Sequence, residues 1–247
     1  MNYDIVGICE THLKDNQSIH LEGYRWIGSN RQHISNKAWR GSGGIGFLIR
    51  NSVFNNFDID ILDNSRDDIL WVNLNRKNDT NLVIRICICY LQPERSSRGN
   101  ISQEFYDHLL SQMYLYSTGD PILICGDFNG RIVDEKYLID SINHLPTRHN
   151  IDTQRNAFGD HLLDFLKDSN CCVLNGRGSS IKDNFTYVSI MGRSVVDYMI
   201  TPYADLKKFS DFEVLLMNDL LLKYNIDLHP NSRIPDHSVL TCTFCYS

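Results

Sequence analysis

The sequence lacks several features that would assign a protein to a class at once. No apolar run approaches the ~18 residues that a membrane-spanning helix needs. The first ten residues contain two acids and no basic residue, which argues against a signal or transit peptide. Only six prolines are spread over 247 residues, and neither an internal repeat nor a low-complexity linker is present. We therefore expect a single domain, 1–247, with no membrane partner and no obligate protein partner that the sequence reveals.

The eight cysteines lack the spacing of a zinc site. Cys242 and Cys245 form a CxxC, but neither a second pair nor a suitably spaced histidine accompanies it. Most of the others lie inside or beside apolar runs. We interpret all eight as reduced core thiols of an intracellular protein.

The chain also lacks a positive charge excess. Its net charge is −6, which gives no general sign of nucleic-acid binding. One segment differs, because Gly23 to Phe57 contains no acid and holds the aromatic residues Tyr24, Trp26 and Trp39 together with five basic residues: Arg25, Arg31, Lys37, Arg40 and Arg50. Such a segment is consistent with binding along a phosphate backbone. It is equally consistent with a solvated basic loop.

Hydrophobic residues make up 42% of the chain, and their pattern predicts many strands and few helices. Short apolar or β-branched runs predict strands over 5–9, 44–49, 69–74, 82–90, 121–125, 172–174, 185–188, 195–200 and 239–244. Apolar residues at helical spacing predict helices over 101–116 and 157–167. The stretch 212–222 fits either. The mixture favours an α/β fold with two sheets flanked by helices.

Acids and other catalytic-type residues follow or end several of these strands. Glu10 follows the first, Tyr90 ends another, and the sequence Gly126-Asp127-Phe128-Asn129 follows a third. Asp197 lies within 195–200, and Asp236-His237 precede the last strand. Burying an acid is costly unless it is paired or binds a cation. Because strand ends share a sheet edge, these residues could converge on a Mg²⁺ site suited to phosphoester hydrolysis.

These motifs, in this order, resemble those of the endonuclease/exonuclease/phosphatase superfamily. The matching stretches cover nearly the whole chain: Glu10-Thr11-His12-Leu13, Tyr90, Gly126-Asp127-Phe128-Asn129, Ser194-Val195-Val196-Asp197-Tyr198 and Asp236-His237-Ser238. Within the superfamily, the chain looks most like the apurinic-type endonuclease domain of non-LTR retrotransposons, on stretches such as 154–159, 162–165, 173–176 and 192–194. The resemblance implies a four-layer α-β-β-α sandwich of two mixed sheets flanked by helices, a DNA substrate and a nuclear location.

The resemblance also implies a role for each motif residue. Glu10 would ligate Mg²⁺, or Mn²⁺ in its place, and Asp236 would lie at the metal or assist at the phosphate. Asp127 would position or deprotonate the attacking water, and Asn129 would help hold the water and the phosphate. His237 would contact the scissile phosphate, Asp197 would orient and polarise His237, and Tyr90 would hydrogen-bond a phosphate oxygen. Read without the resemblance, Asp197 could instead be a structural acid paired with an arginine, and Tyr90 an ordinary strand-end tyrosine.

The chain departs from the superfamily pattern at its start. Members normally open with a strand that carries an Asn, then a helix, and only then the strand that ends in Glu. Here Glu10 comes almost at once, so we expect an N-terminally truncated domain with an unpaired strand edge. Three functions follow: a DNA-nicking endonuclease, a phosphatase or lipid phosphodiesterase of the same fold, or a catalytically impaired or domesticated remnant that at most binds nucleic acid.

Overall fold

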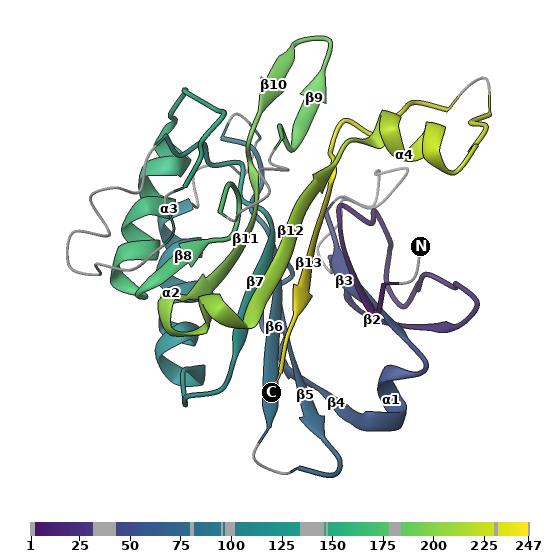
Figure 1. Cartoon of the computed structure of the whole chain (residues 1–247), viewed down its shortest axis with the longest axis vertical. Coiled ribbons are helices and arrows are strands. Elements are labelled where there is room, and N and C mark those ends of the chain that lie inside the picture. The colour runs from purple at the N-terminus through teal and green to yellow at the C-terminus, as the bar shows by residue number, and fades with distance from the viewer. Residues whose placement is uncertain are drawn as a thin grey trace. The chain divides into compact units, whose positions relative to one another are not determined.

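The computed structural model describes residues 3–31, 43–79, 82–94, 96, 102–133, 146, 148–177, 184–229 and 232–246 (Figure 1). The chain divides into two compact units, Met1–Phe128 (unit 1) and Asn129–Ser247 (unit 2). Lys37, Trp39 and Arg40 of the basic segment lie outside the described residues.

Unit 1 contains seven described strands and two helices. An antiparallel sheet has the order β1-β3-β2, and a second group of strands has the order β4-β5-β6-β7, in which β6 and β7 are parallel and the other neighbours antiparallel. The elements are β1 (Ile5–Cys9), β2 (Tyr24–Ser29), β3 (Ile45–Arg50), α1 (Val53–Asn56), β4 (Phe57–Asp63), β5 (Ile69–Arg76), β6 (Val83–Tyr90), α2 (Ser102–Tyr116) and β7 (Ile122–Asp127).

The core of unit 1 forms around β5, β6 and the apolar face of α2. Phe105, Leu109 and Met113 of α2 are buried at the helical spacing that the sequence shows. Trp71 of β5 is fully buried, and its indole N–H donates to Gln112 Oε1 at 3.0 Å. This core holds the ends of β6 and β7 in place.

Unit 2 contains one long helix and several short paired strands. β8 pairs with β11, β9 with β10, and β12 with β13, all antiparallel. The elements are α3 (Ala157–Asp168), β8 (Cys171–Val173), β9 (Tyr187–Ser189), β10 (Gly192–Ser194), β11 (Asp197–Pro202), the 3₁₀ helix η3 (Tyr203–Lys208), β12 (Phe209–Leu215), α4 (Met217–Lys223) and β13 (Val239–Phe244). In Figure 1 the β9–β10 hairpin projects from the body of this unit.

The predicted fold class is confirmed, because the chain is an α/β protein with mixed sheets flanked by helices. The strands over 5–9 and 239–244 have the predicted bounds. The sequence analysis did not predict β2 and β4, because charged residues in such short segments are typical of loops. The ambiguous stretch 212–222 is divided between the end of β12 and α4.

Among the described residues, β1 pairs with β3 alone and is therefore an edge strand. Its apolar residues Ile5, Val6 and Ile8 are only half-buried. This agrees with the expected unpaired edge, while the truncation itself stays a prediction. No helix in the described part of the chain is long and apolar enough to cross a membrane. None of the eight cysteines, which all lie among the described residues, forms a disulfide, but Cys245 is exposed and is not the core thiol that we expected.

Candidate functional site

Three of the predicted residues meet at one end of the strands of unit 1. β6 and β7 run parallel, and their register places Tyr90 opposite Asp127 at the carboxyl ends of both strands. β1 contacts both strands, and Glu10 follows directly after it. The parallel pairing of β6 and β7, together with the contacts that β1 makes with both, therefore brings Glu10, Tyr90 and Asp127 together, as the sequence predicts.

Gly126 permits this close approach. Its φ is +143°, and a Cβ built at this position would lie 1.9 Å from the carbonyl oxygen of Cys89 on β6. Since that neighbour is backbone, it cannot move aside without disturbing the strand pair. A glycine is therefore required directly before Asp127.

Tyr90 links the buried strand end to the more exposed Glu10. The Tyr90 hydroxyl donates a hydrogen bond to Glu10 Oε1. Burial raises the pKa of Tyr90, and the hydrogen bond to Glu10 and the negative charges of Glu10, Asp127 and Cys9 raise it further. Tyr90 therefore keeps its proton at neutral pH and acts as a hydrogen-bond donor.

The segment after Glu10 is pinned to the turn before β3. Glu10 has a left-handed backbone with φ 54°, a conformation that non-glycine residues rarely adopt. The N–H groups of Thr11 and His12 donate to the carbonyl oxygens of Gly44 and Gly43 at 3.1 and 2.9 Å. The neighbouring backbone thus holds Glu10 in its uncommon conformation.

Glu10 and Asp127 each offer carboxylate oxygens of the kind that a hard divalent cation takes as ligands. Both carboxylates are close enough to Tyr90 for their charges to raise its pKa. Asp127 is buried, whereas Glu10 is exposed and accessible from solvent. Two acids at one strand end repel each other, and a cation offsets that repulsion. Oxygen ligands of this kind suit Mg²⁺ or Mn²⁺.

In unit 2, Asp197 and His237 form a close pair. Both carboxylate oxygens of Asp197 lie 3.0 Å from His237 Nδ1. Because an ionised carboxylate only accepts hydrogen bonds, Nδ1 carries the hydrogen, which orients the imidazole. The ring of Tyr187 packs edge-on against His237, with 5.1 Å between the ring centroids. Asp197 therefore has a histidine partner, which differs from the structural arginine pair that was its alternative interpretation.

Two buried polar side chains that the sequence analysis did not place in the site hold Asp197. The Thr186 hydroxyl accepts hydrogen bonds from the N–H groups of Val196 and Asp197, both at 3.0 Å. Asn175 donates to the carbonyl oxygen of Asp197 at 3.0 Å and accepts from Met199 N at 3.1 Å. Thr186 has no recognisable sequence signal, whereas Asn175 lies in the stretch 173–176 that carries the resemblance, without a role assigned to it there.

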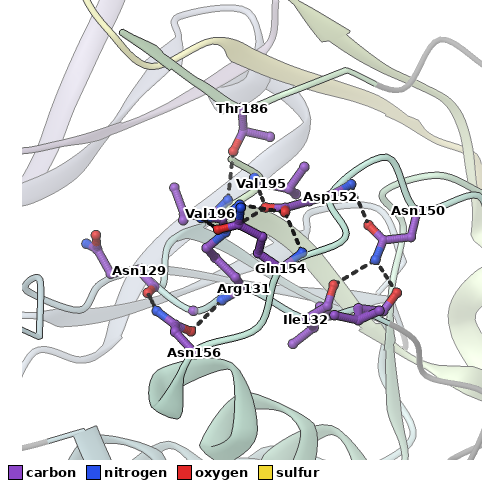
Figure 2. Close-up of polar contacts among 12 residues, drawn as sticks. Asn129, Arg131, Ile132, Asn150, Asp152, Gln154, Asn156, Thr186, Val195 and Val196 are labelled. Atoms are coloured by element: carbon purple, nitrogen blue, oxygen red, sulfur yellow. Dashed lines mark hydrogen bonds and ion pairs between the residues drawn. The ribbon is translucent and has the colours of Figure 1, made fainter. Parts of the chain in front are cut away.

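Asn129 begins unit 2 in a left-handed conformation, with φ 47°. Its carbonyl oxygen accepts from Asn156 Nδ2 at 2.8 Å (Figure 2). Asn156 Oδ1 in turn accepts from the N–H of Arg131 and caps α3 through the N–H of Gly159, each at 2.8 Å. Asn156 is thus a helix cap that also anchors residues 129–131, which we call the Asn129 loop.

Asp236 differs from the other predicted residues. It is exposed, and its printed contact is a backbone one, in which its carbonyl oxygen accepts from Val188 N at 2.8 Å. This contact fixes the start of the His237 segment against β9. The predicted role of Asp236 at the metal or the phosphate stays a prediction.

Comparison with known proteins agrees with this geometry. A model of the Endonuclease/Exonuclease/phosphatase family matches residues 1–211. No curated protein matches the sequence.

Several solved structures share the fold at low sequence identity. The endonuclease domain of TRAS1, a telomere-specific non-LTR retrotransposon, has a TM-score of 0.61 at 15% identity, covering 91% of this chain and 81% of that one. A 3′-phosphatase from Neisseria bound to a product DNA hairpin has a TM-score of 0.59 at 12% identity, with 98% and 89% covered. The AP endonuclease of Leishmania major has a TM-score of 0.67 at 12% identity, with 99% and 79% covered.

Proposed function

Because the chain belongs to the Endonuclease/Exonuclease/phosphatase family, we propose that it is a metal-dependent phosphodiester hydrolase, specifically a retroelement-derived endonuclease that nicks DNA. The observation that carries this proposal is the meeting of Glu10, Tyr90 and Asp127 at one strand end. Two carboxylates around a protonated phenol combine a cation site, a group to orient water and a hydrogen-bond donor. Phosphoester hydrolysis needs all three.

The proposal gives a chemical role to Glu10, Asp127 and Tyr90 of unit 1 and to Asn129, the first residue of unit 2. Glu10 holds the divalent cation, which when bound offsets negative charge on the phosphate. Asp127 orients the attacking water and accepts its proton. The Tyr90 hydroxyl, which keeps its proton, donates to a phosphate oxygen. Asn129 helps to hold the water and the phosphate.

The residues of unit 2 complete the proposal. Asp197 keeps the hydrogen of His237 on Nδ1, so that Nε2 is the nitrogen directed to the phosphate. The carboxylate also stabilises a positive charge on the imidazole, which makes His237 a better partner for developing negative charge. Asp236 assists at the metal or the phosphate.

DNA is favoured as the substrate by an exposed hairpin. Ile190 and Met191, at the tip of β9–β10, are 103% and 89% exposed. Arg193 lies over the ring of Phe185 at 4.7 Å from its centroid, on the same hairpin. Apolar tips beside a basic side chain are the kind of wedge that proteins insert between base steps in the minor groove.

The basic segment supports this choice less than the sequence suggests. Arg31 pairs with Asp67 at 3.2 Å, and Arg50 pairs with Asp4 at 3.4 Å. Arg25 lies over the ring of Phe54 at 4.2 Å. The two ion pairs reduce the net positive charge that the described part of the segment presents to a phosphate backbone.

A plasmid-nicking assay tests the proposal. The wild-type protein should convert supercoiled plasmid to the open-circular form in Mg²⁺ and not in EDTA. Asp127→Ala and His237→Ala should each reduce the rate by about 10²–10⁴-fold. Asp164→Ala, at an exposed position of α3, serves as the control and should cut like the wild type. Equal cutting by the wild type and both site variants would show that the activity comes from a contaminant.

Parallel assays separate the other candidate functions. Hydrolysis of an inositol phosphate or of sphingomyelin without plasmid nicking would favour a phosphatase or lipid phosphodiesterase. DNA binding without hydrolysis would favour the catalytically impaired remnant. Replacing Ile190 and Met191 with serine should weaken binding to duplex DNA and leave hydrolysis of a small phosphodiester unchanged.

A further inference from the structure

Arg131 and Asp152 form an ion pair close in sequence to Asn129. The guanidinium donates from Nη2 to Asp152 Oδ1 at 2.7 Å and from Nε to Asp152 Oδ2 at 2.9 Å. Its Nη1 donates to Gln154 Oε1 at 2.9 Å. Asp152 is only 2% exposed. Such a bidentate pair fixes both side chains in orientation as well as in position.

Asp152 extends this pair to the strand that carries Asp197. Asp152 Oδ2 also accepts from the N–H of Val195 at 2.9 Å, two residues before Asp197 (Figure 2). Burial alone would raise the pKa of Asp152, but the hydrogen bonds from Arg131, Val195 and Gln154 lower it below its ordinary value. Asp152 is therefore a carboxylate at neutral pH.

A second connection joins the same two segments. The Tyr198 hydroxyl lies within hydrogen-bonding distance of the carbonyl oxygens of Val195 and Gly130, at 2.8 and 3.0 Å. Tyr198 is fully buried. Gly130 and Gly159 allow the loop to approach α3, since a Cβ on Gly159 would lie 2.0 Å from the carbonyl oxygen of Arg131. The Asn129 loop is thus attached both to α3 and to the start of β11.

We propose that Arg131 and Asp152 are positioning residues that hold the Asn129 loop and the Asp197–His237 pair in a fixed mutual arrangement. The path of contacts is Asn129–Asn156–Arg131–Asp152–Val195. It continues through the next two residues, because the Thr186 hydroxyl accepts hydrogen bonds from the N–H groups of Val196 and Asp197. This inference rests on the proposed hydrolase function for its kinetic consequence. Its structural consequence, the orientation of His237, is independent of that function.

The competing role for Arg131 is direct binding of a DNA phosphate. The guanidinium uses three of its N–H groups on Asp152 and Gln154, and its side chain is 22% exposed. Only two of its five N–H groups would remain for a phosphate. The two roles differ in kinetics, because loss of a phosphate contact raises KM, whereas loss of positioning lowers kcat.

The test compares Arg131→Met, Arg131→Lys and Asp152→Asn in the full chain. Arg131→Met should lower kcat for plasmid nicking by about 10- to 100-fold with little change in KM, the size that misplacement of a catalytic group produces. Arg131→Lys keeps the positive charge but lacks the planar guanidinium that donates two N–H groups to Asp152. Its kcat should therefore lie between those of the wild type and Arg131→Met. Asp152→Asn keeps one acceptor oxygen at this position and removes the negative charge that Arg131 binds.

Arg85→Met is the matched control. Arg85 forms an ion pair with Asp120 at 2.5 Å that is about as buried as the Arg131–Asp152 pair. Arg85 lies near the start of β6, whereas Tyr90 is the last residue of that strand. Arg85→Met should lower the free energy of unfolding in urea about as much as Arg131→Met does, and it should leave kcat unchanged. This control separates a positioning effect from a general loss of stability.

The second measurement is the NMR resonance of His237 Nδ1–H, assigned with His237→Gln. We expect this resonance to shift or broaden in Arg131→Met and Asp152→Asn and to stay in place in Arg85→Met. If it stays in place in all three, or if KM rises while kcat holds, the positioning role is overturned. If the wild type cuts nothing but the resonance moves as expected, the proposed function fails and the positioning role stands.

Discussion

The two groups of candidate residues are held in place by different means. In unit 1, backbone pairing places Tyr90 opposite Asp127, and the side chains share a strand end because the strands share a direction. In unit 2, buried side chains hold Asp197, through Thr186 and Asn175. A register held by many ladder hydrogen bonds tolerates most side-chain changes. A strand held by single hydroxyl and amide groups is sensitive to each of them.

The largest expected effect is on the strand register of unit 1. Gly126→Ala places a methyl group against the backbone of Cys89, so we expect the free energy of unfolding to fall by about 3 kcal/mol or more. Gly119→Ala is the matched control, because Gly119 also has a positive φ, +98°, but open space around its Cβ position. Urea denaturation should show a cost of only about 1 kcal/mol there. Equal costs at both sites would show that backbone conformation matters and the close approach does not.

A smaller effect is expected from the side-chain support of unit 2. Thr186→Val keeps the shape but leaves the N–H groups of Val196 and Asp197 without their acceptor, which should lower the free energy of unfolding by about 2 kcal/mol in total. Thr186→Ser keeps the hydroxyl and should lose only about 1 kcal/mol, for one methyl group. Urea denaturation gives both values. If the serine variant is the less stable, the methyl packing and not the hydroxyl supports Asp197.

The smallest effect is expected at Tyr90. Tyr90→Phe removes one hydrogen bond to the exposed Glu10, at about 1 kcal/mol. The pKa of Tyr90 is raised above its ordinary 10.0, so the hydroxyl stabilises the fold fully below pH 10 and loses that contribution as the pH rises further. The stability difference between wild type and variant should therefore be constant from pH 7 to about pH 9 and should narrow above about pH 10. A difference that is unchanged at pH 11 would argue against the Tyr90–Glu10 bond.

Much of the fold was predictable where an apolar pattern was strong. The strand before Glu10 and the last strand have the predicted bounds, and α3 follows its apolar spacing with Asn156 as its cap. β4 was missed because its alternating Asp residues resemble a solvated charge run, although their alternation suits an edge strand with one face in water. β11 begins two residues later than predicted, at Asp197, because the N–H groups of Val196 and Asp197 bind the Thr186 hydroxyl.

The sequence by itself determined the family and the strand ends at which its motif residues lie. The resemblance of the ordered motifs predicted the family, and the bounds of the apolar runs placed Glu10, Tyr90 and Asp127 at or after strand ends, because strand bounds follow from local periodicity. Only the tertiary structure decided what holds these residues. Arg131 pairs with Asp152, and Thr186 with Asp197, across 21 and 11 residues of sequence. Such contacts depend on how distant segments pack, which local pattern does not encode.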